Sequence, residues 1–152
     1  MIIRRAEVHD QEALIALMTH YLVEFFHRPD PGHAALQAYI TRLLDNPYEG
    51  IQWVAEADGR VAGFTTLLFT YSTLRLQRIA ILNDLFVLPE FRGRKIGEAL
   101  FGACREAASQ YGCAFLQWET TADNMVAQAL YDKMGGERSP LWTYTLEIQT
   151  SG

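Results

Sequence analysis

A basic turn that contains glycine follows a long apolar run in the middle of the chain. The run extends over residues 79–87, and Pro89 ends it because proline cannot donate a ladder hydrogen bond. The basic residues lie at 92–95, and from Ile96 onward apolar residues recur at helical spacing. A helix N-terminus offers free backbone N–H groups and a partial positive charge. The segment therefore predicts a site for a phosphorylated ligand at the start of a helix.

A second pair of residues suited to chemistry lies in a predicted helix near the C-terminus. Asn124 and Tyr131 are seven residues apart in the predicted helix over 123–134. This spacing places them on one helix face, two turns or roughly 10 Å apart. Taken alone, Tyr131 would be better interpreted as a partly buried aromatic residue of the core.

The elements that position these residues follow from periodicity and turn signals. The predicted strands are 2–5, 51–56, 61–71, 79–87, 114–120 and 141–148, and Asp58-Gly59 is a strong hairpin signal between the second and third. The predicted helices begin near Asp10, Leu36, Ile96 and Asp123. This order predicts a mixed α/β sheet, antiparallel early and parallel where a helix crosses over. We expect one domain over residues 1–152.

Two common phosphate motifs are absent. The chain has no Gly-Lys-Ser/Thr as in a P-loop, and the spacing of Gly93 and Gly97 is not that of a dinucleotide fold. The segment Arg92-Gly93-Arg94-Lys95-Ile96-Gly97 instead resembles the pyrophosphate loop of the GNAT superfamily of acetyl-CoA-dependent N-acetyltransferases, whose pattern is Gln/Arg-x-x-Gly-x-Gly/Ala. Lys95 stands where that family usually has glycine.

Asn124 and Tyr131 carry the second part of the resemblance. They look like the family's second block, in which the Asn contacts the pantetheine arm and the Tyr lies beside the CoA sulfur. The resemblance implies a centrally splayed sheet of about seven strands with helices on both faces. It implies acetyl-CoA as cosubstrate, held by these residues: Leu85, Phe86, Val87, Arg92, Gly93, Arg94, Lys95, Ile96, Gly97, Glu98, Asn124 and Tyr131.

The family's reaction requires a neutral amine, a polarised thioester carbonyl and a protonated leaving thiol. The resemblance implies that an N–H near Val87 points at the thioester oxygen and that Tyr131 protonates the sulfur. Three carboxylates could act as base or hold the ammonium group: Asp84, Glu24 and Glu119. Burying Asp84 unpaired in an apolar strand is costly, so it has either a function or a partner such as Arg78. Glu24 also suits a solvated helix position.

The acceptor amine is less well defined. The segments around Tyr71 and Asn83 look most like the diamine and polyamine acetyltransferase branch, in which Glu often precedes the Asp that corresponds to Asp84. This chain has Asn83 there. We expect the acceptor contacts from Glu24, Tyr71, Asn83, Asp84 and Glu119. The alternative is a non-catalytic acyl-CoA-binding module of the same fold.

Composition and charge limit the other kinds of partner and location that the protein could have. The net charge of -5 argues against nucleic-acid binding. No signal-peptide core or membrane-length apolar run is present, so we expect a cytoplasmic protein without membrane association. Cys104 and Cys113 lack metal-ligand spacing and suit reduced packing residues, and we expect no metal. Trp142 and Tyr144 on the last predicted strand suit the interface of a homodimer or packing within one monomer.

Overall fold

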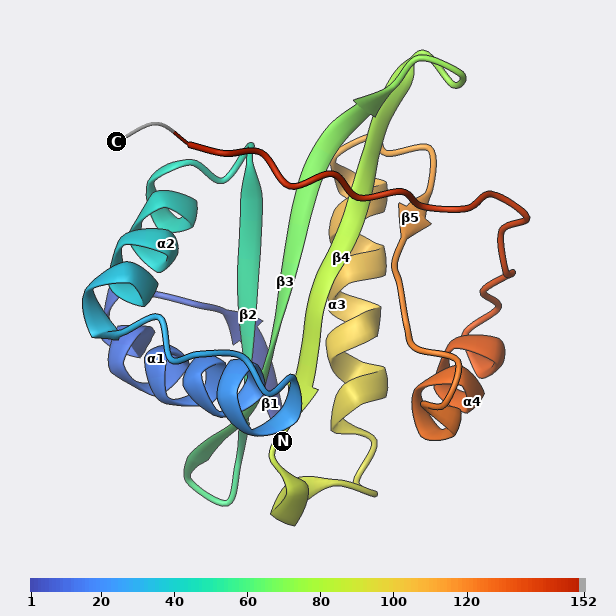
Figure 1. Ribbon diagram of the computed structural model, residues 1–152. Helices are drawn as coiled ribbons and strands as arrows, with labels where there is room; N and C mark the ends of the chain where they lie inside the picture. The colour runs from blue at the N-terminus through green and yellow to red at the C-terminus, as the bar shows by residue number, and fades with distance from the viewer. Residues whose placement is uncertain (151–152) are drawn as a thin grey trace. The chain divides into compact units, whose positions relative to one another are not determined.

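The computed structural model describes residues 1–150 and consists of two compact units (Figure 1). The first unit is Met1–Glu119, and the second begins at Thr120. The first unit contains the sheet and most helices, and the second contains one helix and an extended segment.

The sheet of the first unit has five strands in the order β1-β2-β3-β4-β5. Their bounds are β1 Ile2–Arg5, β2 Gly50–Ala57, β3 Arg60–Ser72, β4 Gln77–Val87 and β5 Leu116–Gln117. The first four strands pair antiparallel, and β5 runs parallel to β4. The predicted mixed sheet is thus confirmed, but our expectation of about seven strands was too high by two.

The two faces of the sheet carry different helices. The first helix, α1 (Gln11–Thr19), continues as the π-helix η2 (His20–Phe25), and α2 is His33–Asp45. Adjacent residues of β3 show the division: Phe64 packs against Tyr21, whereas the Thr65 hydroxyl lies 3.4 Å from Cys104 Sγ of α3 (Ile96–Gln110). Figure 1 shows α1 and α2 on one face and α3 on the other.

Local chemistry explains several of these elements. Asp58 and Gly59 both have positive φ, 53° and 73°, which a tight turn between β2 and β3 requires. Asp10 lies at the N-cap position of α1 as predicted, but its carboxylate does not cap that helix. It accepts hydrogen bonds from both terminal nitrogens of Arg4, at 2.7 and 2.9 Å, and these bonds hold the pKa of Asp10 below its usual range. The ion pair ties β1 to α1.

Buried apolar side chains fill both sides of the sheet. Phe64, Leu14 and Ile40 are fully buried on the α1–α2 side, and Leu100 and Cys104 are fully buried on α3. Both cysteines are free, and burial raises the pKa of the Cys104 thiol to about 12. Cys104 is therefore a packing residue with little thiolate character.

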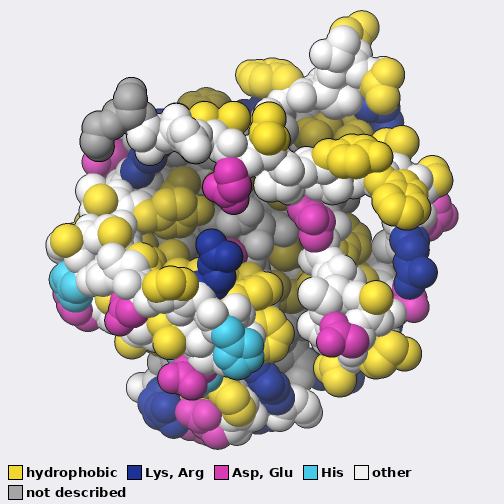
Figure 2. Space-filling model, in the orientation of Figure 1, with side chains coloured by type: hydrophobic (Ala, Val, Ile, Leu, Met, Phe, Trp, Pro, Cys, Tyr) yellow, Lys and Arg dark blue, Asp and Glu magenta, His cyan; other side chains and the backbone are white. Residues whose placement is uncertain are grey.

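The second unit contains α4, Met125–Lys133, and a C-terminal extended segment. Residues 141–148 form no strand, contrary to the sequence prediction. The apolar side chains of this segment stand out at its surface, with Trp142 87% exposed and Tyr144 93% exposed (Figure 2). Alternation predicted a strand here, but a strand also needs a neighbour with which to exchange backbone hydrogen bonds.

Candidate active site

A β-bulge shapes the C-terminal half of β4. Thr66 of β3 pairs with Asp84, whereas the next residue, Leu67, pairs with Leu82, so Asn83 has no partner in the β3–β4 register. Directly opposed residues share a sheet face, so Asp84 lies on the side of Thr66 and Leu82 lies on the opposite side. The bulge therefore turns Asp84 toward the α1–α2 face of the sheet.

Three side chains hold the Asp84 carboxylate. Thr66 and the phenol of Tyr21 donate hydrogen bonds to it, and Asn83 Nδ2 donates to Oδ2 at 3.2 Å. Burial raises the pKa of Asp84, and these three hydrogen bonds lower it by a smaller amount. Asp84 is thus a carboxylate with increased basicity, which suits a group that must accept a proton.

The Thr66 hydroxyl is itself oriented by a side chain of the neighbouring strand β2. Gln52 of β2 donates from Nε2 to Thr66 Oγ1 at 3.0 Å, and both residues are buried. Because this contact occupies Thr66 as an acceptor, the single hydroxyl proton is available to Asp84. A line of side chains across three strands therefore positions the carboxylate.

Aromatic rings surround the same position. Tyr21 lies 5.5 Å from Phe86, 5.7 Å from Phe64, 4.9 Å from Phe26 and 6.2 Å from Phe25, measured between ring centroids. Phe64 and Phe86 are buried, whereas Phe25 and Phe26 are nearly half exposed. Of these rings, only Phe86 was a predicted site residue, as a contact of the cosubstrate. Tyr21, Phe25 and Phe26 were not, although three aromatic residues within 21–26 are a visible signal.

Of the other predicted acceptor residues, Tyr71 lies apart from Asp84. Tyr71 is five residues along β3 from Thr66, roughly 16 Å away. Arg78, the suggested partner of Asp84, instead donates to the Tyr48 carbonyl at 2.6 Å and lies 4.7 Å from the Phe69 ring. Glu24 is exposed on η2, and Glu119 is exposed at the end of the first unit.

The basic turn lies between β4 and α3, as predicted. Arg92 donates from Nε to the Val87 carbonyl at 3.0 Å, and Arg94 forms two hydrogen bonds with Asp58, at 2.7 and 3.1 Å. Gly93 has φ 78°. The first residues of α3 are Ile96, Gly97 and Glu98, and the first N–H groups of a helix have no intrahelical acceptor. The turn can thus present backbone donors to an anion.

Lys95 has a backbone conformation that favours glycine. It has φ 63° and ψ 20°, in the left-handed region, immediately before α3. This geometry accounts for the glycine usually found at this place in the GNAT pattern. The lysine therefore adds a positive charge to the turn at the cost of backbone strain.

We expect Lys95→Gly to increase the free energy of unfolding by about 0.5–1 kcal/mol. Removing left-handed strain gains about 1–2 kcal/mol, and the added freedom of glycine in the unfolded chain offsets about 0.5–1 kcal/mol. Urea unfolding with an unchanged m-value measures the difference. Glu106→Gly, inside α3, is the matched control and should lower stability by about 0.5–1 kcal/mol. If Lys95→Gly and Glu106→Gly lowered the free energy of unfolding by the same amount, the backbone of Lys95 would not be strained.

The outer edge of β4 is open within the first unit. β5 pairs with β4 only at Ala80 and Ile81, so residues 82–87 have a strand partner on the β3 side alone in residues 1–119. The edge includes Leu85, Phe86 and Val87. It can accept an extended group that offers amide hydrogen bonds.

The second unit places Asn124 at the N-cap of α4. Asn124 Oδ1 accepts from the Ala127 N–H at 3.1 Å, so the helix begins at Met125 and not at Asp123. Tyr131 lies within α4 and is half-buried, and burial raises the pKa of its phenol. The phenol is thus protonated at neutral pH and can act as a donor.

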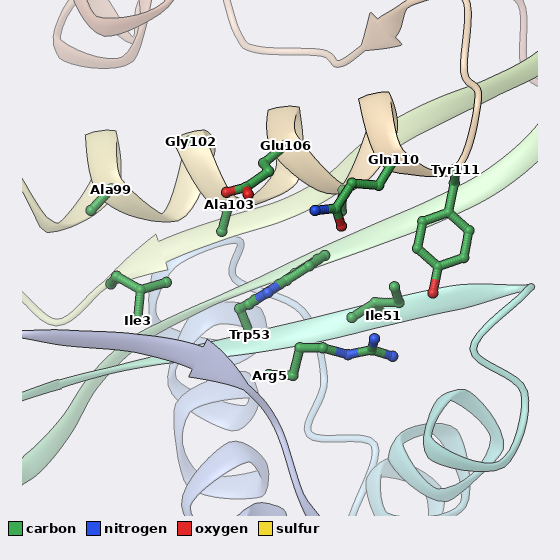
Figure 3. Close-up of a pocket in the computed structure, with 11 residues that line it drawn as sticks. Ile3, Arg5, Ile51, Trp53, Ala99, Gly102, Ala103, Glu106, Gln110 and Tyr111 are labelled. Atoms are coloured by element: carbon green, nitrogen blue, oxygen red, sulfur yellow. The ribbon is translucent and has the colours of Figure 1, made fainter.

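One cavity lies away from Asp84, on the other side of the sheet. It has a volume of about 520 Å³ and lies between α3 and strands β1 and β2, with Arg5, Trp53, Glu106 and Tyr111 in its lining (Figure 3). Trp53 pairs with Thr65, so it shares the α3 face of the sheet, opposite to the face of Asp84. The candidate catalytic residues do not line this cavity.

Neither a metal cluster nor a spanning helix is found in residues 1–150. No group of three or more His, Cys, Asp or Glu side chains there could hold a metal ion. No helix of that range has the length and apolarity needed to cross a membrane.

Comparison with known proteins identifies the family. A model of the acetyltransferase (GNAT) family matches residues 14–136. The chain is 36% identical over 137 residues to the uncharacterized N-acetyltransferase YhfO of Bacillus subtilis, covering 90% of both chains. This chain belongs to the GNAT acetyltransferase family, and it is an N-acetyltransferase, an acyl-transferring enzyme.

Solved structures show the same fold. The crystal structure of a probable acetyltransferase superposes with a TM-score of 0.86 at 28% identity, covering 99% of this chain and 100% of the other. The aminoglycoside N-acetyltransferase AAC(6')-Iy in complex with CoA gives a TM-score of 0.80 at 21% identity, with coverage of 96% and 93%. The predicted fold family is thereby confirmed.

Proposed function

We propose that this enzyme transfers the acetyl group of acetyl-CoA to the primary amine of a small molecule. The observation that carries the proposal is the arrangement along β4. A half-buried, hydrogen-bonded carboxylate lies on the strand at Asp84, and the same strand leads directly into the basic turn at the start of α3. One element thus connects a candidate base with a candidate diphosphate site.

Acetyl-CoA would bind along this element. The diphosphate would contact the backbone donors at Gly97 and Glu98, with the charges of Arg92 and Lys95 nearby. The pantetheine amides would pair with the open edge at residues 85–87. The CoA named with the structurally similar aminoglycoside acetyltransferase supports this cosubstrate.

The reaction would proceed by direct attack on the thioester. Asp84 would accept a proton from the substrate ammonium group, directly or through water, which leaves a neutral amine. The nitrogen would form a C–N bond with the acetyl carbon as the C–S bond breaks, while an N–H near Val87 stabilises the carbonyl oxygen. Tyr131 would donate its phenolic proton to the departing thiolate, and Asn124 would contact the pantetheine arm. The acetylated nitrogen would release its extra proton to the Tyr131 phenolate, directly or through water, which restores the phenol.

A thiol-release assay with acetyl-CoA and a panel of amines tests the function. Release that depends on an amine supports acetyl transfer. CoA binding by calorimetry without release for any amine would favour the non-catalytic acyl-CoA-binding module. Diamines and polyamines belong in the panel because of the resemblance around Tyr71 and Asn83.

We expect Gly97→Leu to weaken CoA binding at least tenfold. The bulky side chain would lie in the first turn of α3, where the diphosphate would approach the backbone closely. Gly102→Leu is the matched control, since a Cβ at Gly102 meets nothing within 4 Å. Calorimetry measures both variants, and equal CoA affinity for Gly97→Leu and the unmodified protein would remove the diphosphate from this turn.

We also propose a homodimer that uses the C-terminal segment. The support is the exposure of alternating apolar residues over 141–148, since exposed apolar surface of this kind marks interaction sites. Light scattering at micromolar concentration measures the mass, and a monomer would contradict the proposal.

A further inference from the structure

We infer that the acceptor is a monoamine carried on an aromatic or bulky apolar body, and not a polyamine. The inference rests on the proposed acetyl transfer and on Asp84 as the group that meets the ammonium. It deepens that function by naming the chemical class of the acceptor. Two independent features carry it: the charge around Asp84 and the rings beside it.

The charge around Asp84 suits one ammonium group. The groups that act on the carboxylate are Thr66 on β3, Asn83 on β4 and Tyr21 on η2, and none of them is an acid. On α2, the charge of Asp84 acts on the phenol of Tyr39, whose pKa is raised first by burial and then by that charge. A second ammonium group would find no carboxylate among these groups, and Glu24 on η2 is exposed to solvent, where an ion pair contributes little.

A cation also lies beside the rings. The guanidinium of Arg92 is 5.8 Å from the centroid of the Phe86 ring, and Phe86 contacts both Tyr21 and Phe25. An acceptor with several positive charges would meet this guanidinium as a like charge. The uncharged body of a monoamine would meet no such repulsion from Arg92.

The rings provide the apolar surface. The π-helix η2 brings Tyr21, Phe25 and Phe26 together, with the rings of Phe25 and Phe26 5.0 Å apart at 83°. Phe25 is 45% exposed and Phe26 is 47% exposed. Because the Tyr21 phenol also donates to Asp84, ring contacts lead from the exposed pair to the carboxylate. An aromatic body could pack on these rings while its amine reaches Asp84.

Matched acceptors test this class directly. Hexylamine and 1,5-diaminopentane have the same number of non-hydrogen atoms and differ by one positive charge, and 2-phenylethylamine adds a ring. We expect kcat/KM for 2-phenylethylamine to exceed that for 1,5-diaminopentane at least tenfold, with hexylamine between them, because an apolar pocket discriminates by about tenfold or more.

Substitutions of Phe25 and Phe26 test whether these rings cause the preference for 2-phenylethylamine. Phe25→Ala and Phe26→Ala should each lower kcat/KM for 2-phenylethylamine about three- to tenfold, the scale of one aromatic contact. The value for methylamine, which is too short to reach them, should change less than twofold. Leu74→Ala removes a side chain that is 93% exposed in the turn between β3 and β4, and it should leave all acceptors unchanged.

Binding without turnover separates this inference from the proposed function. Calorimetry of the CoA-loaded protein gives dissociation constants for 2-phenylethylamine and 1,5-diaminopentane when no acetyl group is present. Tighter binding of 2-phenylethylamine without thiol release would support the acceptor class and overturn acetyl transfer. Equal or better binding and turnover of 1,5-diaminopentane would overturn the acceptor class and leave acetyl transfer intact.

Discussion

Asp84→Asn is expected to lower kcat by about 10²- to 10⁴-fold, the usual contribution of a general base. The amide keeps the shape of the side chain and still accepts from Thr66 and Tyr21, but it cannot take a proton. Thiol release at saturating acetyl-CoA measures kcat, and calorimetry should show a nearly unchanged dissociation constant for CoA. A variant with the turnover of the unmodified protein would exclude Asp84 as the base.

The pH profile gives a second measure of the same role. The carboxylate must be ionised to accept a proton, and burial raises its pKa, so kcat/KM should fall as the pH falls through that raised value. Thr66→Val removes a donor to the ionised form and should move this acidic limb to higher pH. Thr65→Val is the matched control, because its hydroxyl donates to the Asp84 main-chain carbonyl at 2.7 Å and not to the carboxylate. An acidic limb at the same pH in all variants would assign the titration to another group.

Tyr131→Phe is expected to lower kcat by about 10²- to 10⁴-fold, because the thiolate would leave without a proton donor. Burial raises the pKa of the phenol, so the donor form persists through neutral pH and activity should fall only as the pH rises through that raised value. Single-turnover measurements isolate the chemical step, and the dissociation constant of CoA should change little.

The control for this substitution lies in the same unit. Tyr144 is 93% exposed, so Tyr144→Phe removes a phenol of the same kind and should not alter single-turnover rates. If Tyr131→Phe also reacts at the full rate when chemistry is limiting, the departing sulfur obtains its proton elsewhere.

Much of the fold could be predicted from local signals. Asp58-Gly59 predicted the first hairpin because both residue types tolerate positive φ, and the proline and basic residues after Val87 predicted the break between β4 and α3. These features depend on a few adjacent residues. Local chemistry is enough to specify them.

The details of the candidate site could not be predicted in the same way. The run over 79–87 is almost continuously apolar, so it carries no alternation from which to locate the bulge at Asn83 or the face of Asp84. Two of the three residues that donate hydrogen bonds to the Asp84 carboxylate, Thr66 and Tyr21, are distant from it in the sequence. The alternating pattern over 141–148 predicted a strand, and this prediction was wrong because strand pairing depends on a neighbour that the local sequence does not specify.

The open edge of β4 has a consequence for solubility. Unpaired N–H and C=O groups along an apolar strand are a template for other strands, and proteins usually cover such edges or add charges to them. Residues 85–87 carry no charge, and the C-terminal segment of the same chain has the alternating apolar pattern that adds readily to a free edge. A cosubstrate whose amides occupied residues 85–87 would therefore protect the folded enzyme from self-association as well as supply its acetyl group.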